Sequence, residues 1–175
     1  VMEEPAITEP GQSVTSDIQA QMLNDSDILV AVPGDGGWKV TNLCLAYDSE
    51  GNPITDEEGN SVSNGVGDLA PVVARKDDNI FVAWRQVAST DTVDVINFNA
   101  RDYIYFCYSE DGGETWSAPA PIYNGTSGSV KGIEAAMLPD GTAAVAFALE
   151  GAGQNVAEGE YNQNVAYAVV GENAE

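Results

Sequence analysis

The sequence predicts an all-β protein assembled from three repeated antiparallel sheets, on the strength of three observations. One short pattern occurs three times along the 175 residues. A run of apolar β-branched and aromatic residues, typical of a strand, follows each copy. No segment keeps the apolar period of a helix over the ~10 residues that a helix needs. A compact β-sandwich-like unit is the alternative arrangement of the same strands.

Each copy of the pattern reads as a strand, a polar turn and a second strand. The copies at 18–32, 70–84 and 133–147 align with one another without a gap. Their turns contain Asp, Asn and Gly, which supply the side-chain caps and positive φ angles of tight hairpins. The expected turns are 24–27, 76–79 and 139–142, the first strands 18–23, 70–75 and 133–138, and the second strands 28–32, 79–84 and 142–148.

A third strand follows each hairpin, expected at 41–47, 102–108 and 164–170. These runs are apolar on both faces, as in strands that lie buried between neighbouring sheets. Fourth strands are expected near 53–55 and 118–123. The copies are 52 and 63 residues apart, a spacing that matches one four-stranded blade of a β-propeller per repeat.

The chain therefore divides into a short leader and three blade-like repeats. Residues 1–16 are expected to be a tail or an outer strand, followed by repeats at 17–66, 67–131 and 132–175, the last of them truncated. Inserts at 87–100 and 150–163 separate the second and third strands of their repeats. Both are polar loops at the same corner of a blade, where repeat proteins usually bind ligands.

The charge of the chain excludes some classes of partner. Six Lys and Arg residues stand against 28 Asp and Glu residues, a formal net charge of −22. Nucleic acids and anionic membranes would repel such a chain. No apolar run approaches the ~20 residues that span a bilayer, so membrane insertion is not expected. This acidity is typical of solubility outside the cell, and we expect a secreted or cell-surface protein.

Histidine is absent, which excludes Ser-His-Asp and Cys-His hydrolases and His-ligated zinc sites within this chain. Cys44 and Cys107 have no metal-binding spacing. We expect both to be buried free thiols on strands, with a single disulfide between them as the minority alternative. No cofactor is expected. A structural calcium ion is a candidate because carboxylates are abundant, but no clear motif supports it.

The most specific motif is Ser-Glu-Asp-Gly-Gly-Glu-Thr-Trp at 109–116, which follows the third strand of the second repeat. Its fixed positions are Ser109, Asp111, Gly113, Thr115 and Trp116. We expect a hairpin turn in which Asp111 accepts backbone N–H groups, the glycines adopt conformations closed to other residues, and Trp116 packs beneath. A weaker counterpart without the tryptophan is present at 48–52.

This motif resembles the Asp-box of the sialidase-like BNR-repeat superfamily, and the three repeats extend the resemblance along the chain. The resemblance implies a β-propeller, of which this chain would be a part, and a secreted or cell-surface protein that often acts on glycans. It implies a structural role for the five Asp-box residues. It also implies where catalytic residues would lie in a sialidase, with Arg85, Glu134 and Tyr161 as the weak candidates here.

The function expected from these residues is a non-catalytic Asp-box module that serves as a scaffold or binds a glycan. The alternative is a fragment of a sialidase-like glycoside hydrolase whose remaining blades supply the catalytic residues. The family takes three arginines from several blades, whereas Arg75, Arg85 and Arg101 all lie in the second repeat. Three blades would also leave apolar faces open, so self-association or further blades are expected as partners.

Overall fold

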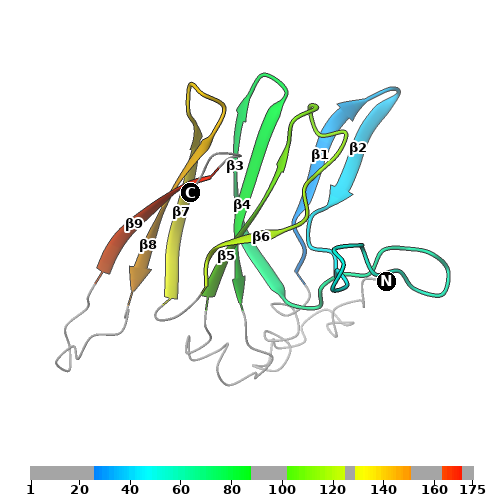
Figure 1. Ribbon diagram of the computed structural model, residues 1–175, viewed down its shortest axis with the longest axis horizontal. Helices are drawn as coiled ribbons and strands as arrows, with labels where there is room; N and C mark the ends of the chain where they lie inside the picture. Colours follow the sequence, from blue (N-terminus) through cyan, green and yellow to red (C-terminus); the bar gives the residue numbers. More distant parts are fainter. Residues whose placement is uncertain (1–25, 88–101, 125–128, 151–162, 171–175) are drawn as a thin grey trace, which may run out of the picture.

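Nine strands form three separate antiparallel sheets in the computed structural model, which describes residues 26–87, 102–124, 129–150 and 163–170 (Figure 1). No helix occurs in these ranges, and hence none that could cross a membrane. No sheet closes on itself. The all-β prediction is confirmed. The strands are β1 (Leu29–Gly34) and β2 (Gly37–Asn42); β3 (Gly67–Lys76), β4 (Asn79–Val87), β5 (Asp102–Ser109) and β6 (Ala120–Tyr123); and β7 (Ser129–Met137), β8 (Ala143–Glu150) and β9 (Gln163–Val170).

The second and third sheets confirm the strands predicted for the second and third repeats. β3 and β4 are joined by a two-residue turn in which Asp77 has a φ of +54°. β7 and β8 are joined by a longer turn, closed by Leu138 and Thr142, in which Gly141 has a φ of +91°. Short polar residues and glycine tolerate this left-handed backbone. The inserts between β4 and β5 and between β8 and β9 lie almost wholly outside the described residues.

The prediction for the first repeat is partly wrong. A strand forms at the predicted 28–32 as β1, but it is the first strand of a hairpin with β2 at 37–42, and not a second strand followed by one at 41–47. Cys44 therefore lies in the loop beyond β2. The reason is the Asp35–Gly36 dipeptide, a strong two-residue hairpin signal, with Gly36 at a φ of +92°. The predicted first strand, 18–23, and the leader, 1–16, lie outside the described residues. No strand forms at 53–55, where isolated bridges occur instead.

The connection from β2 to β3 consists of two turns of the same design, eight residues apart. Asp48 accepts the backbone N–H groups of residues 50 and 52, and Asp56 accepts those of residues 58 and 60. The extended segments beside the turns form a closed ring of backbone hydrogen bonds. Ala46 N–H donates to Val62 C=O, Val62 N–H to Ile54 C=O, and Ile54 N–H to Ala46 C=O. Only the first of these two turns was predicted from the sequence.

The core lies on both faces of the middle sheet, which stands between β1–β2 and β7–β9 (Figure 1). β4 alternates strictly. Ile80, Val82 and Trp84 pack with the first sheet, and Phe81 and Ala83 pack with the third. The prediction of strands buried on both faces is confirmed for β5, where Ile104 and Cys107 point to opposite clusters. It is wrong for β9, which exposes one apolar face.

Candidate functional site

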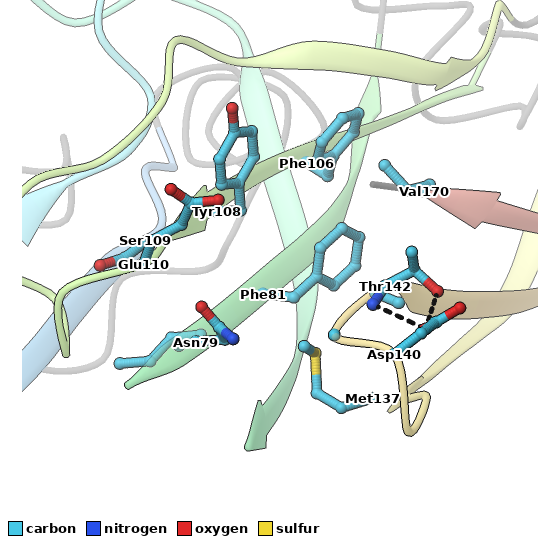
Figure 2. A pocket seen from close by; sticks show the side chains of 13 residues that line it. Asn79, Phe81, Phe106, Tyr108, Ser109, Glu110, Met137, Asp140, Thr142 and Val170 are labelled. Atoms are coloured by element: carbon cyan, nitrogen blue, oxygen red, sulfur yellow. Dashed lines mark hydrogen bonds between the residues drawn. The ribbon is translucent and has the colours of Figure 1, made fainter. Parts of the chain in front are cut away.

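An open groove of about 260 Å³ lies where the middle and third sheets meet (Figure 2). One of its walls is a row of aromatic rings from β4 and β5. Phe81 stacks on Phe106 with ring centroids 5.4 Å apart, and Phe106 stacks on Tyr108 at 6.5 Å. Phe106 and Tyr108 are two residues apart on β5, and Tyr108 is the cross-strand partner of Phe81, so all three share one face. Tyr108 is exposed.

Polar groups stand at the rim of the groove, on two different turns. Glu110 comes from the Asp-box turn, and Asp140 and Thr142 come from the β7–β8 turn, on the other side of the rings in Figure 2. Asp140 Oδ1 accepts hydrogen bonds from the hydroxyl and the backbone N–H of Thr142, which lower the pKa of this carboxyl below its ordinary value. Among the described residues lining the groove are two carboxylates and no Lys or Arg. The groove therefore favours a ligand that is not an anion.

The Asp-box turn beside the groove is held by its own side chains. Ser109 is buried, and its Oγ accepts the N–H of Gly113 at 2.8 Å and donates to Asp111 Oδ1 at 2.8 Å. Asp111 also accepts the hydroxyl of Thr115 at 2.6 Å and the backbone N–H of Thr115 at 2.9 Å. These donors hold the pKa of Asp111 well below its ordinary value. Asp111 itself is exposed, so the buried part of this network is Ser109.

This turn also joins the middle sheet to the first sheet. Gly113 packs directly on Val32 of β1. Lys39 Nζ of β2 donates hydrogen bonds to Glu114, one to its carboxylate at 2.8 Å and one to its backbone oxygen. Trp116 packs against the cluster between the two sheets. The contacts of the motif are thus mostly with the protein itself.

Arg85 is occupied by an ion pair inside the protein. Its Nη2 lies 2.9 Å from Oδ1 of Asp102, which is completely buried, while Asp102 Oδ2 accepts the backbone N–H of Val130 at 2.7 Å. An arginine at the end of a strand usually forms an ion pair on the protein surface. Here the carboxylate is internal and connects β4, β5 and β7.

The weak catalytic candidates are not brought together. Arg85 pairs across the sheet with Ile104, on the face of the middle sheet that packs against the third sheet. Glu134 is exposed on β7, and its neighbours Ile133 and Ala135 point into the core, so Glu134 lies on the far face of the third sheet. Tyr161 lies outside the described residues. A sialidase-type site is therefore not assembled from Arg85 and Glu134.

A second polar cluster, of Asp27, Cys44 and Asp68, lies between the first and middle sheets and has ligand atoms within 4.8 Å of one another. Its carboxylates already accept hydrogen bonds from neutral donors. The Asp27 carboxylate accepts hydrogen bonds from the side chains of Asn42 and Ser63. The Asp68 carboxylate accepts hydrogen bonds from Trp84 Nε1, at 2.6 Å, and from the side-chain amides of Asn64 and Gln86. Burial raises the pKa of Asp68 nonetheless. The cluster works as an internal hydrogen-bond network that ties the β2–β3 connection to the middle sheet.

Both cysteines are buried free thiols. Burial raises the pKa of Cys107 to about 12, and burial followed by the nearby Asp68 carboxylate raises that of Cys44 further. Cys107 lies on β5 as predicted. Because thiolates are the metal-binding and nucleophilic form, neither thiol is poised for that chemistry at neutral pH.

The groove was not predicted from the sequence. The signal that could have found it is the alternation of Phe106 and Tyr108 on one strand face, directly before the Asp-box. Compared with known proteins, the chain matches no family model and no curated protein. Kinship with the Asp-box superfamily therefore stays a proposal that rests on the motif and the repeated strands.

Proposed function

We propose that this chain is a non-catalytic Asp-box module of a secreted or cell-surface protein, that its three sheets are blades of a partial β-propeller, and that it binds a glycan in the groove. The observation that carries the proposal is the aromatic wall of the groove, where the exposed ring of Tyr108 stacks on Phe106, and Phe106 stacks in turn on the buried Phe81. The flat C–H face of a sugar ring can pack on such an exposed aromatic face.

The rim supports a sugar as the ligand. Asn79, Glu110 and Asp140 border the groove and offer amide and carboxylate groups to hydroxyls. The volume of about 260 Å³ is below the ~300–1,000 Å³ of sites for drug-sized ligands, which suits one or two sugar rings. With two carboxylates and no cation among the described lining residues, the ligand is a neutral or amino sugar and not a sialic acid.

The test is titration of the chain with methyl β-glucoside, methyl β-galactoside and N-acetylglucosamine, with sialyllactose as the anionic comparison, followed by NMR or calorimetry. At least one neutral sugar binds. Tyr108→Ala weakens that binding about tenfold, because an aromatic contact contributes ~0.5–1.5 kcal/mol beyond the area it buries. Tyr167→Ala, which removes an exposed tyrosine outside the groove, leaves binding unchanged.

Binding of sialyllactose alone, or a Tyr108→Ala variant that binds as tightly as the parent, would contradict the proposal. We also expect no release of fluorophore from an aryl sialoside, since Arg85 is paired with Asp102 and Glu134 lies on the far face of the third sheet. Turnover that is lost in Glu134→Gln would restore the hydrolase alternative.

A further inference from the structure

In the part of the chain that the structure describes, the third sheet leaves a broad apolar face exposed. On β9, Val165 and Tyr167 are 80% and 79% exposed, and Val169 is exposed beside them. Their cross-strand partners on β8 are alanines, at 148, 146 and 144. Glu134, opposite Ala146 on β7, is the single charged residue among the described positions in these three rows. A flat surface of this kind is typical of an interface.

The first sheet leaves a second apolar face uncovered at the other end of the molecule (Figure 1). Trp38 is 71% exposed, and Leu29 and Val40 are exposed as well. Trp38 pairs with Pro33 and Val40 with Ala31, so this hairpin presents apolar residues on its outer side as well as on the side that packs on the middle sheet.

Each uncovered face has a counterpart that is covered within the chain. In the strand register, the β8–β9 pairs Ala144–Val169 and Ala146–Tyr167 correspond to the β4–β5 pairs Phe81–Tyr108 and Ala83–Phe106. In the middle sheet, Phe81, Ala83 and Phe106 are covered by the third sheet.

The free face of the first sheet also matches a covered face of the middle sheet. Counted from their two-residue turns, Trp38 and Val40 of β2 correspond to Ile80 and Val82 of β4. Ile80 and Val82 are covered by the first sheet. One free face therefore corresponds to the side of the middle sheet that receives the next sheet, and the other to the side that receives the previous sheet.

We infer that a second copy of this chain covers these faces, head to tail. The β8–β9 face of one copy packs on the β1–β2 face of the other, which continues the stacking already present between the middle and third sheets. Two such contacts, related by a twofold axis, close a ring of six sheets and leave neither face free. The contact does not depend on sugar binding.

Charge shapes the strength of this association. Each copy has a formal net charge of −22, so two copies repel one another. The two faces themselves are almost uncharged, and the repulsion acts between more distant groups. Salt screens distant charges over ~8–10 Å at moderate ionic strength. Dimerisation therefore strengthens as the salt concentration rises.

The test is the molar mass of the whole chain by light scattering, at several concentrations and at low and high salt. The expected mass is twice 18.4 kDa. Tyr167→Lys and Trp38→Lys are each monomeric, because every contact needs one face of each kind. An equimolar mixture of the two variants regains a dimer through the one contact whose faces are both intact. Val73→Lys, on a strand residue that is 65% exposed and outside both faces, remains dimeric.

Several results would overturn the inference. A monomeric parent chain would show that these faces do not pair with those of a second copy. A Trp38→Lys variant that stays dimeric would indicate a contact between two β9 faces. Two monomeric variants whose mixture fails to regain a dimer would show that the β8–β9 and β1–β2 faces do not pack on one another. Masses that grow beyond the dimer with concentration would indicate an open stack. Circular dichroism checks the fold of each variant, and Val165→Lys and Val40→Lys replace any variant that unfolds.

Discussion

Replacing Gly113 with alanine tests how the Asp-box turn is held. Gly113 has a φ of +96°, and a Cβ added there would lie 2.7 Å from Cγ1 of Val32 and 3.2 Å from Cγ2. The backbone conformation alone costs an L-residue ~1–2 kcal/mol. The β-branched Val32 is stiff and buried, so the overpacking adds ~1–3 kcal/mol. We expect Gly113→Ala to lower the free energy of unfolding by ~2–5 kcal/mol in urea titrations followed by circular dichroism.

Gly112→Ala is the matched control in the same turn. Gly112 has a φ of +74°, but its nearest neighbour, Asp78 Oδ1, would lie 3.7 Å from the added Cβ, an ordinary contact. This variant should lose only the ~1–2 kcal/mol of backbone strain. In a Val32→Ala background, where the Cγ atoms of Val32 are gone, Gly113→Ala should lower the free energy of unfolding only by the same amount as Gly112→Ala. If Gly113→Ala costs no more than Gly112→Ala, or costs as much without Val32, the turn is not packed on β1 as described.

Three further predictions concern buried and titrating groups. Asp102→Ala should lower the free energy of unfolding by about 3 kcal/mol in the same titrations. This is the low end of the ~3–5 kcal/mol for breaking a buried pair, because Arg85 is partly exposed. The double variant Arg85→Leu with Asp102→Leu should recover most of this loss, and a single variant that loses no more stability than the double variant would refute the prediction. Asp111 has a lowered pKa, so its charged form stabilises the fold above about pH 4, and this contribution is lost as pH falls below the unfolded value of 3.8. The melting temperatures of the parent and Asp111→Asn should therefore converge from pH 6 to pH 2, and a constant gap would contradict the assignment. Cys44 and Cys107 should resist a thiol reagent at pH 8 in the native protein and react fully in guanidinium, whereas rapid native labelling would contradict their burial.

The sequence was most informative where repeats and turn residues agreed. The β3–β4 and β7–β8 hairpins follow from alternating apolar residues around Asp77 and Gly141, because local turn chemistry and burial favour the same register. The strands of the first repeat were predicted wrongly because the repeat alignment placed its turn at 24–27, whereas the hairpin turns at the Asp35–Gly36 dipeptide.

The candidate site was harder to predict than the strands. The groove lies between the strands of two sheets, with a turn from each sheet at its rim, so it depends on how the sheets pack and not on any local pattern. Arg85 is recognisable from the sequence as a charge at a strand end. Its buried partner is not, because Asp102 follows a long insert and is brought to β4 only by sheet pairing.

The ring of three hydrogen bonds in the β2–β3 connection has a consequence for how this loop varies in evolution. Ala46, Ile54 and Val62 each use both the backbone N–H and the C=O within the ring, so none of the three offers a free backbone group to another strand. Removing one eight-residue turn would leave two segments able to pair with each other as an ordinary bridge. Adding a turn would require the ring to open. We therefore expect natural length variants of this loop to be shorter by eight residues, and seldom longer.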